Sequence, residues 1–139
     1  MRVFVDTNVL LDVLARRQPF YEASARIWSL AEAGEIKAHI SAISFNNIYY
    51  IVRKLKKRKT AEDALRLLRD VFEPVAADGQ ILNQSIDAGM DDFEDAVQYH
   101  SAVRAKASCL ITRNPEHFPS STLPVLSPDE FLAAFREKD

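Results

Sequence analysis

The sequence contains a single cysteine and no long apolar run. Cys109 has no second cysteine to pair with, so an intrachain disulfide is excluded and a reducing compartment is expected. No segment approaches the roughly 18 apolar residues that a membrane-spanning helix requires, and Asp6 interrupts the apolar N-terminus, which argues against a signal peptide. We therefore expect a cytoplasmic protein that makes no contact with a membrane.

Internal repeats, low-complexity segments and an evident linker are also absent. The chain has 139 residues, of which 47% are hydrophobic and 27% are charged, an ordinary composition for a globular protein. This length suffices for one domain with a proper core and leaves little room for a second. We therefore expect a single domain that spans residues 1–139.

A net positive charge is missing too, because 18 basic residues face 20 acidic ones and the net charge is −2, which argues against a generic nucleic-acid binder. The basic residues are unevenly distributed, however. Segment 53–59 holds six of the 18 and no acidic residue, which leaves 12 basic against 20 acidic residues elsewhere. This basic segment consists, apart from one leucine, of Arg53, Lys54, Lys56, Lys57, Arg58 and Lys59. It could contact RNA phosphates or form the solvated end of a helix, and the charge run alone does not decide between these interpretations.

What the sequence does contain is an alternation of short apolar runs with amphipathic segments. Residues 3–5, 40–44, 108–112 and 123–126 indicate strands that lead into polar turns or helix starts, and residues 73–75 indicate an edge strand. Thr60 and Ser127 are candidate N-caps of two later helices. Strands that alternate with helices predict an α/β fold, with a parallel sheet covered by helices on both faces.

Polar side chains recur where the predicted strands end and where the helices begin. The candidate site residues are Asp6, Asn47, Asp92, Asp95 and Asn114. Because the carboxyl ends of parallel strands lie together, we expect these side chains to converge. The group contains carboxylate and amide oxygens but no cysteine or histidine, which favours Mg²⁺ or Mn²⁺ over Zn²⁺. Metal-assisted attack of water on a phosphodiester is the natural chemistry of such a site.

The acidic segment 91–95 has both a structural and a functional interpretation. Asp91 and Glu94 fit a capping box at the start of a helix, which accounts for these two residues structurally. Asp92 and Asp95, spaced i, i+3, share one face and repel each other by about a few tenths of a kcal/mol. A divalent cation would reverse that repulsion, so Asp92 and Asp95 are candidate metal ligands; for this pair alone, a place at a helix N-terminus, where acids are favourable, is the alternative interpretation.

Three segments together resemble the PIN-domain ribonucleases, a family that includes the VapC-type toxins of toxin–antitoxin pairs. Residues 5–12 (VDTNVLLD) resemble the opening motif of the family, and residues 92–96 (DFEDA) and 111–118 (ITRNPEHF) are similar to its two later motifs. Residues 123–131 fit its usual ending, so the resemblance covers essentially the whole chain. It implies a three-layer α/β/α PIN-like fold with a central parallel sheet, and Mg²⁺- or Mn²⁺-dependent endonucleolytic cleavage of RNA.

The resemblance also assigns roles to individual residues. The metal ligands that it implies are Asp6, Asp95 and Asp92, and Asn114 falls where the family has aspartate or asparagine. The residues expected to support these ligands by hydrogen bonds are Thr7, Asn8 and Thr112. The partners implied are RNA, an antitoxin protein whose tail lies across the active-site groove, and a second copy of this chain in a homodimer.

One position departs from the family pattern. The family commonly has glutamate in the helix after the second strand, in a Ser-x-x-Ser/Thr-x-x-Glu context, whereas residues 41–47 (SAISFNN) place Asn47 there. An amide oxygen can hold a metal or its water but brings no charge, so we expect one well-held ion, weak metal affinity and reduced activity.

Two alternatives follow from these residues. The first is a degenerate PIN module that binds RNA or protein without efficient cleavage, which Asn47 favours. The second is a haloacid-dehalogenase-like phosphatase. This alternative is disfavoured, because Asn8 stands where that family has its second aspartate and no cap domain is evident.

Overall fold

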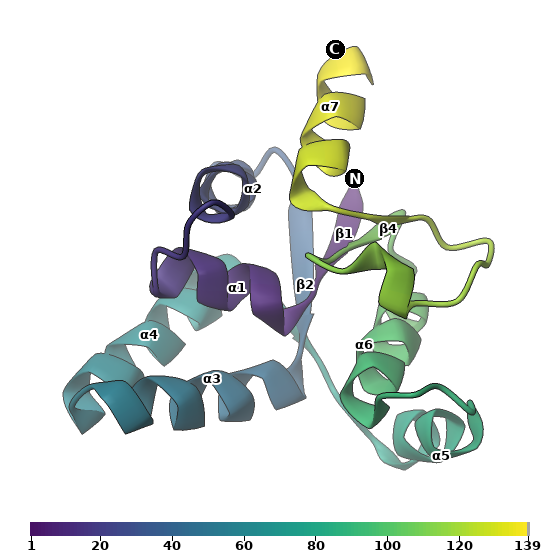
Figure 1. The fold of residues 1–139 in the computed structure, drawn as a ribbon, viewed down its shortest axis with the longest axis horizontal. Helices are drawn as coiled ribbons and strands as arrows, with labels where there is room; N and C mark the ends of the chain where they lie inside the picture. The colour runs from purple at the N-terminus through teal and green to yellow at the C-terminus, as the bar shows by residue number, and fades with distance from the viewer. Residues whose placement is uncertain (139) are drawn as a thin grey trace.

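The computed structural model describes residues 1–138 and is built around one parallel sheet of five strands (Figure 1). The strands are β1 (Arg2–Val5), β2 (Lys37–Ser41), β3 (Glu73–Val75), β4 (Cys109–Ile111) and β5 (Val125–Leu126). They lie in the order β3-β2-β1-β4-β5, and in the central strand Phe4 pairs with His39 on one side and Leu110 on the other. The short strand at residues 73–75 is an edge strand, as predicted.

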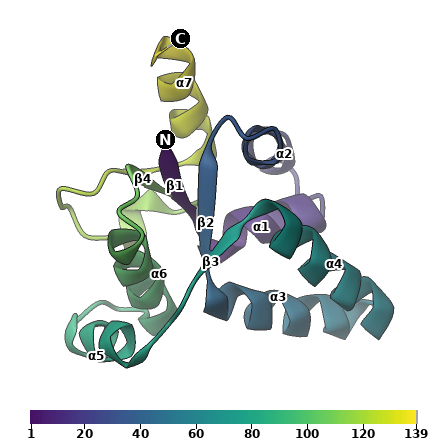
Figure 2. The same cartoon turned by 180° about the vertical axis from the view of Figure 1, so that it is seen from behind.

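Helices cover both faces of this sheet (Figures 1 and 2). On one side lie α1 (Thr7–Leu14), α2 (Tyr21–Glu32), α3 (Ala42–Leu55), α4 (Arg58–Val71) and α7 (Pro128–Lys138). On the other side lie α5 (Gly79–Asp87) and α6 (Phe93–Arg104), and a short 3₁₀ helix, η1 (Pro115–His117), follows β4. The predicted three-layer α/β/α architecture is confirmed.

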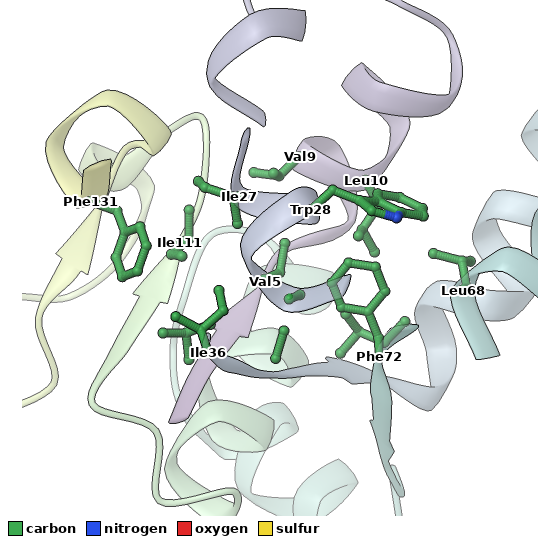
Figure 3. Close-up of a cluster of buried hydrophobic side chains, with 14 of the residues drawn as sticks. Val5, Val9, Leu10, Ile27, Trp28, Ile36, Leu68, Phe72, Ile111 and Phe131 are labelled. Carbon is green, nitrogen blue, oxygen red and sulfur yellow. The ribbon is translucent and has the colours of Figure 1, made fainter. Parts of the chain in front are cut away.

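The central strand β1 contributes to the packing on both faces because successive side chains of a strand point in opposite directions. Val3 and Val5 pack toward α1, α2, α4 and α7, whereas Phe4 packs toward α5 and α6. In the larger of the two cores, the rings of Trp28 and Phe72 meet edge to face with their centroids 4.9 Å apart (Figure 3). This packing holds the central strand rigidly, which suits a strand whose end carries a candidate site.

The basic segment 53–59 includes the end of one helix and the start of the next, with Arg53 and Lys54 in the last turn of α3. Helix α3 ends at Leu55 and α4 begins at Arg58, with Lys57 as its N-cap, so the prediction that Thr60 caps this helix is wrong. Only two residues connect the helices, and the chain therefore turns back into α4 before it reaches Thr60. The segment forms the tip of the α3–α4 hairpin, which projects away from the sheet (Figure 1).

The carboxyl ends of β1, β2 and β4 lie at one end of the sheet, which we call its carboxyl end. Asp6, Ala42 and Thr112 follow these three strands directly, and α1 and α3 begin there. Among residues 1–138, no helix is both long enough and apolar enough to cross a membrane.

Candidate active site

Asp6 has a buried carboxylate at the carboxyl end of the sheet, with 4% of the residue's surface exposed. Its backbone N–H donates to the carbonyl of Ile111 at 2.9 Å, which extends the pairing of β1 with β4 by one residue. Its side-chain Oδ2 accepts a hydrogen bond of 2.8 Å from the Thr112 hydroxyl. The two neighbouring strands therefore fix both the backbone and the carboxylate of Asp6.

Asp95 reaches the same region from the first turn of α6. Asp92 is the N-cap of this helix, and its Oδ1 accepts a hydrogen bond of 2.9 Å from the backbone N–H of Asp95. The prediction that Asp91 and Glu94 form the capping box is therefore wrong, because the helix starts one residue later than that pairing requires. Asp92 thus helps to hold Asp95 in place, and Glu94 does not take part in the cap of this helix.

Glu94 instead faces the candidate site and is joined to α3. The Asn47 side-chain Nδ2 donates a hydrogen bond of 2.6 Å to Glu94 Oε2. The place of Glu94 in this cavity was not predicted from the sequence, because the Asp91–Glu94 capping box gave this residue a structural role. The available signal was the second acid–x–x–acid pair one residue later, Asp92 and Asp95, which serves equally well as a cap and leaves Glu94 unassigned.

These residues line one open cavity of about 340 Å³ between α1, α3 and α6. Its polar lining consists of Asp6, Thr7, Asn8, Asn47, Glu94 and Asp95, and its apolar or aromatic lining consists of Leu11, Tyr50 and Ile51. The cavity thus brings together three of the predicted site residues with the predicted supporting residues Thr7 and Asn8. Asp92 and Asn114 are not among the lining residues.

The carboxylates of the cavity raise one another's pKa values. Burial, together with the charges of Asp95 and Glu94, raises the pKa of Asp6 to about 7, against the opposing effect of the Thr112 hydrogen bond. Burial and the charge of Asp92 raise the pKa values of Glu94 and Asp95, and Asp95 also repels Glu94. Of the described residues that line the cavity, none is lysine or arginine, and the repulsion at Asp95 is offset in part by His117, whose Nδ1 lies 4.0 Å from Asp95 Oδ2 and which lowers the pKa of Asp95.

Thr7 belongs to a buried hydrogen-bond network beneath the cavity. Its Oγ1 lies 2.7 Å from the Ser44 hydroxyl, and the Gln98 side-chain amide donates to both hydroxyls, at 3.2 and 3.4 Å. The network ties together α1, α3 and α6, the three helices that surround the cavity. Thr7 is therefore held by hydrogen bonds that also link the three helices around the cavity.

Asn8, Thr112 and Asn114 form a second network, above β4. The Asn8 amide donates to Thr112 Oγ1 at 3.4 Å, and the backbone N–H of Asn114 donates to the same oxygen at 3.2 Å. Asn8 Oδ1 in turn accepts from the backbone N–H of Arg113 at 3.2 Å. The hydroxyl of Thr112 is thus held where it can donate to Asp6, while Asn114 contributes through its backbone.

An ion pair that the sequence analysis did not identify anchors this network. Arg113 binds the buried carboxylate of Asp12 with two nitrogens, and its guanidinium carbon lies 4.4 Å from the centre of the Phe20 ring. Two parallel hydrogen bonds fix the orientation of the guanidinium on the carboxylate, in addition to pairing their opposite charges. It connects α1 to the loop after β4, and therefore holds the segments that carry Asp6 and Thr112 against each other.

The donors present in the cavity fit a hard divalent cation in their chemistry. Carboxylate and amide oxygens suit Mg²⁺ or Mn²⁺, and the repulsion among the acids favours a bound cation. In residues 1–138, no three His, Cys, Asp or Glu side chains already stand close enough together to hold a metal ion. As these side chains stand, a cation bound here would be held by fewer than three of them, with amide oxygens or water completing its coordination.

Comparison with known proteins decides the family. The sequence model of the PIN domain family matches residues 2–116, a range that includes every candidate site residue. This chain is a PIN domain. The expected resemblance to that family is confirmed.

Several known proteins are similar to the chain over most of its length. Ribonuclease VapC1 of Aquifex aeolicus (strain VF5) is 26% identical over 136 residues, which cover 94% of this chain and 92% of the relative. The toxin–antitoxin complex from Klebsiella pneumoniae contains a chain that matches with a TM-score of 0.67 and 22% identity, covering 91% of this chain and 97% of that one. VapBC-1 from nontypeable Haemophilus influenzae matches with a TM-score of 0.69 and 17% identity, covering 93% of this chain and 99% of that one. These structural similarities confirm the PIN fold.

Proposed function

We propose that this PIN domain is an endoribonuclease that depends on Mg²⁺ or Mn²⁺. The observation that carries the proposal is the cavity in which the buried carboxylate of Asp6 faces Asp95 without a lysine or arginine in the lining. A buried carboxylate whose pKa is raised to about 7 is costly to keep ionised, and a divalent cation is the partner that removes this cost. The similarity to Ribonuclease VapC1 supports RNA as the substrate.

In this proposal Asp6 and Asp95 hold the cation. Asp92 does not line the cavity and acts on the site by capping α6 with Oδ1, which holds Asp95 in place. An ion held by these carboxylates would supply an activated water and a positive charge to offset the charge that develops on the phosphodiester. Thr112 orients the carboxylate of Asp6, and Asn114 supports Thr112 through its backbone N–H.

The same comparisons support one of the proposed partners, an antitoxin protein. We propose that the chain is the toxin of a toxin–antitoxin pair, because structures similar to it include the Klebsiella pneumoniae toxin–antitoxin complex and VapBC-1. An antitoxin protein, a second copy of this chain and RNA are its proposed partners, and the cytoplasm is its proposed location. The basic segment at the tip of the α3–α4 hairpin is proposed to contact the RNA backbone.

A non-cleaving PIN module is the second candidate function. Asn47 favours it, since the position carries an amide where the family commonly has a glutamate. Such a module would bind RNA or a protein partner through the same cavity without hydrolysing a phosphodiester.

Cleavage of a mixed pool of single-stranded RNA distinguishes the two candidates. Wild type, Asp95→Asn and the control Asp91→Asn are compared in Mn²⁺, Mg²⁺ or EDTA, with circular dichroism to confirm folding. Asp91 is an exposed acid beside the site that does not line the cavity, so it controls for loss of charge alone. We expect metal-dependent cleavage by wild type and Asp91→Asn that is lost in Asp95→Asn. Absence of cleavage by every folded variant would favour the non-cleaving module.

A further inference from the structure

We propose that Glu94 supplies the carboxylate that position 47 lacks, and that Asn47 is the residue that positions it. The inference rests on the proposed metal-dependent function and concerns the same cavity. Asn47 brings no charge where the family commonly has a glutamate, and the sequence alone therefore predicted a site with one carboxylate fewer. In this inference Glu94 on α6 provides that carboxylate in place of a residue on α3.

The geometry of the two helices carries the proposal. Asn47 on α3 and Glu94 on α6 both line the cavity that contains Asp6 and Asp95, and the hydrogen bond between them is 2.6 Å long. A side chain that leaves α6 therefore ends beside a side chain of α3. The carboxylate of Glu94 stands next to the position from which a glutamate on α3 would enter the site.

The two oxygens of Glu94 are used differently. Oε2 accepts the Asn47 hydrogen bond, whereas Oε1 makes no hydrogen bond with any residue in the range 1–138. One oxygen thus fixes the carboxylate and the other remains for an ion. Because an ionised carboxylate can only accept hydrogen bonds, it needs a donor in order to be fixed, and the side-chain amide of Asn47 provides one without adding charge.

The surroundings of Glu94 argue against a hydrogen bond that serves structure alone. Asp92 and Asp95 both lie near enough to repel its charge, and the described cavity lining contains no lysine or arginine that would attract it. A tether between α3 and α6 could be made by two neutral side chains without this repulsion. A glutamate in this place is favourable once a cation binds among the acids.

A charge swap tests the inference by measuring Mn²⁺ binding calorimetrically, on the full chain and without RNA. Glu94→Gln keeps an oxygen that can accept from Asn47 and removes only the charge, so a purely structural tether would survive it. We expect Glu94→Gln to weaken Mn²⁺ binding about ten- to hundredfold. The double variant Asn47→Glu/Glu94→Gln returns a carboxylate and an amide to the pair in exchanged positions. We expect it to regain most of the lost affinity.

The control Asp91→Asn removes a neighbouring charge that does not line the cavity, and we expect wild-type Mn²⁺ affinity from it. Wild-type affinity in Glu94→Gln would overturn the inference, and so would a folded double variant that binds no better than Glu94→Gln. Failure of the proposed function looks different, because then wild type itself would neither bind Mn²⁺ nor cleave RNA. If wild type binds Mn²⁺ and Asp95→Asn does not, while Glu94→Gln matches wild type, only the role of Glu94 falls.

Discussion

The hydroxyl of Thr112, just after β4, donates a 2.8 Å hydrogen bond to Asp6, just after β1. This is the only hydrogen bond from a side chain to the carboxylate of Asp6 in the part of the chain that the structure describes. This hydroxyl and the backbone N–H of Thr7 do not offset the burial of the carboxylate, so the pKa of Asp6 in the metal-free site stays raised, at about 7.

The stability of the metal-free protein is expected to fall as the pH rises toward 7. The pKa of Asp6 is raised in the folded state to about 7, from an ordinary value of 3.8, so between these values the folded protein keeps a proton that the unfolded chain releases. The stability that protonated Asp6 contributes is fully present below the ordinary pKa and is lost as the pH rises through the pKa of the folded state. In this range the free energy of unfolding falls by at most about 1.4 kcal/mol per pH unit on account of Asp6.

Asp6→Asn cannot ionise at this position and should flatten this part of the profile. Urea unfolding of both proteins in EDTA from pH 4 to pH 8 measures the difference. Parallel profiles for wild type and Asp6→Asn would contradict the raised pKa.

Asn47→Glu alone is expected to destabilise the metal-free protein. The substitution replaces the donor at 2.6 Å from Glu94 with a second carboxylate, which removes a hydrogen bond and adds a like charge. We expect a loss of about 1–2 kcal/mol in EDTA near pH 7, recovered in part by Mn²⁺. Thermal unfolding with and without Mn²⁺ measures this, and Asn47→Gln, which keeps an amide, is the matched control. An unchanged melting temperature in EDTA would show that the Asn47–Glu94 contact contributes nothing.

Tyr50→Ala is expected to weaken the binding of single-stranded RNA. The Tyr50 side chain lines the cavity one helical turn from Asn47, yet 61% of it is exposed, so its ring can stack on an unpaired base beside the carboxylates. We expect a loss of about 1–3 kcal/mol in affinity, with Tyr50→Phe close to wild type. Fluorescence anisotropy in EDTA separates binding from cleavage. Phe93→Ala removes an equally prominent exposed ring outside the cavity and should have little effect.

Neutralising the tip of the α3–α4 hairpin should reduce the salt dependence of RNA binding. The triple variant Lys54→Gln/Lys56→Gln/Lys57→Gln removes three exposed cations next to α3, whose other end lines the cavity. If all three contact phosphates, the slope of log K against log salt should fall by about 2. Lys37→Gln removes an exposed cation from the opposite end of the sheet and should leave the slope unchanged. An unchanged slope in the triple variant would exclude the tip as an RNA contact.

Features that rest on signals within a few residues were predictable from the sequence. Ser127 and Glu130 form the reciprocal cap of α7, with hydrogen bonds of 3.1 and 2.8 Å, because both partners belong to one turn of chain. The strand before Asp6 and its place in a parallel sheet followed from apolar runs in the same way. Local chemistry therefore defined most of the elements and the end of the sheet at which the site lies.

The phase of α6 could not be predicted in this way. Asp91 and Asp92 are both acceptable caps, and each is followed three residues later by an acid. With Asp92 as the N-cap, Glu94 faces α3 and accepts a hydrogen bond from Asn47, which is 47 residues away in the sequence. Phe93 and Val103 on that helix are about half exposed although both are apolar. The two local patterns, Asp91–Glu94 and Asp92–Asp95, predict the start of α6 equally well, and contacts with segments distant in the sequence determine which of them forms the cap.

Both margins of the sheet resist the addition of a further strand. Strand β3 is three residues long with Pro74 at its centre, which has no backbone N–H to offer, and β5 is only two residues long. Short edge strands and proline are means by which proteins prevent sheets from joining. Two copies of this chain would therefore meet through their helices, and a partner protein would have to be recognised by side chains rather than by backbone pairing.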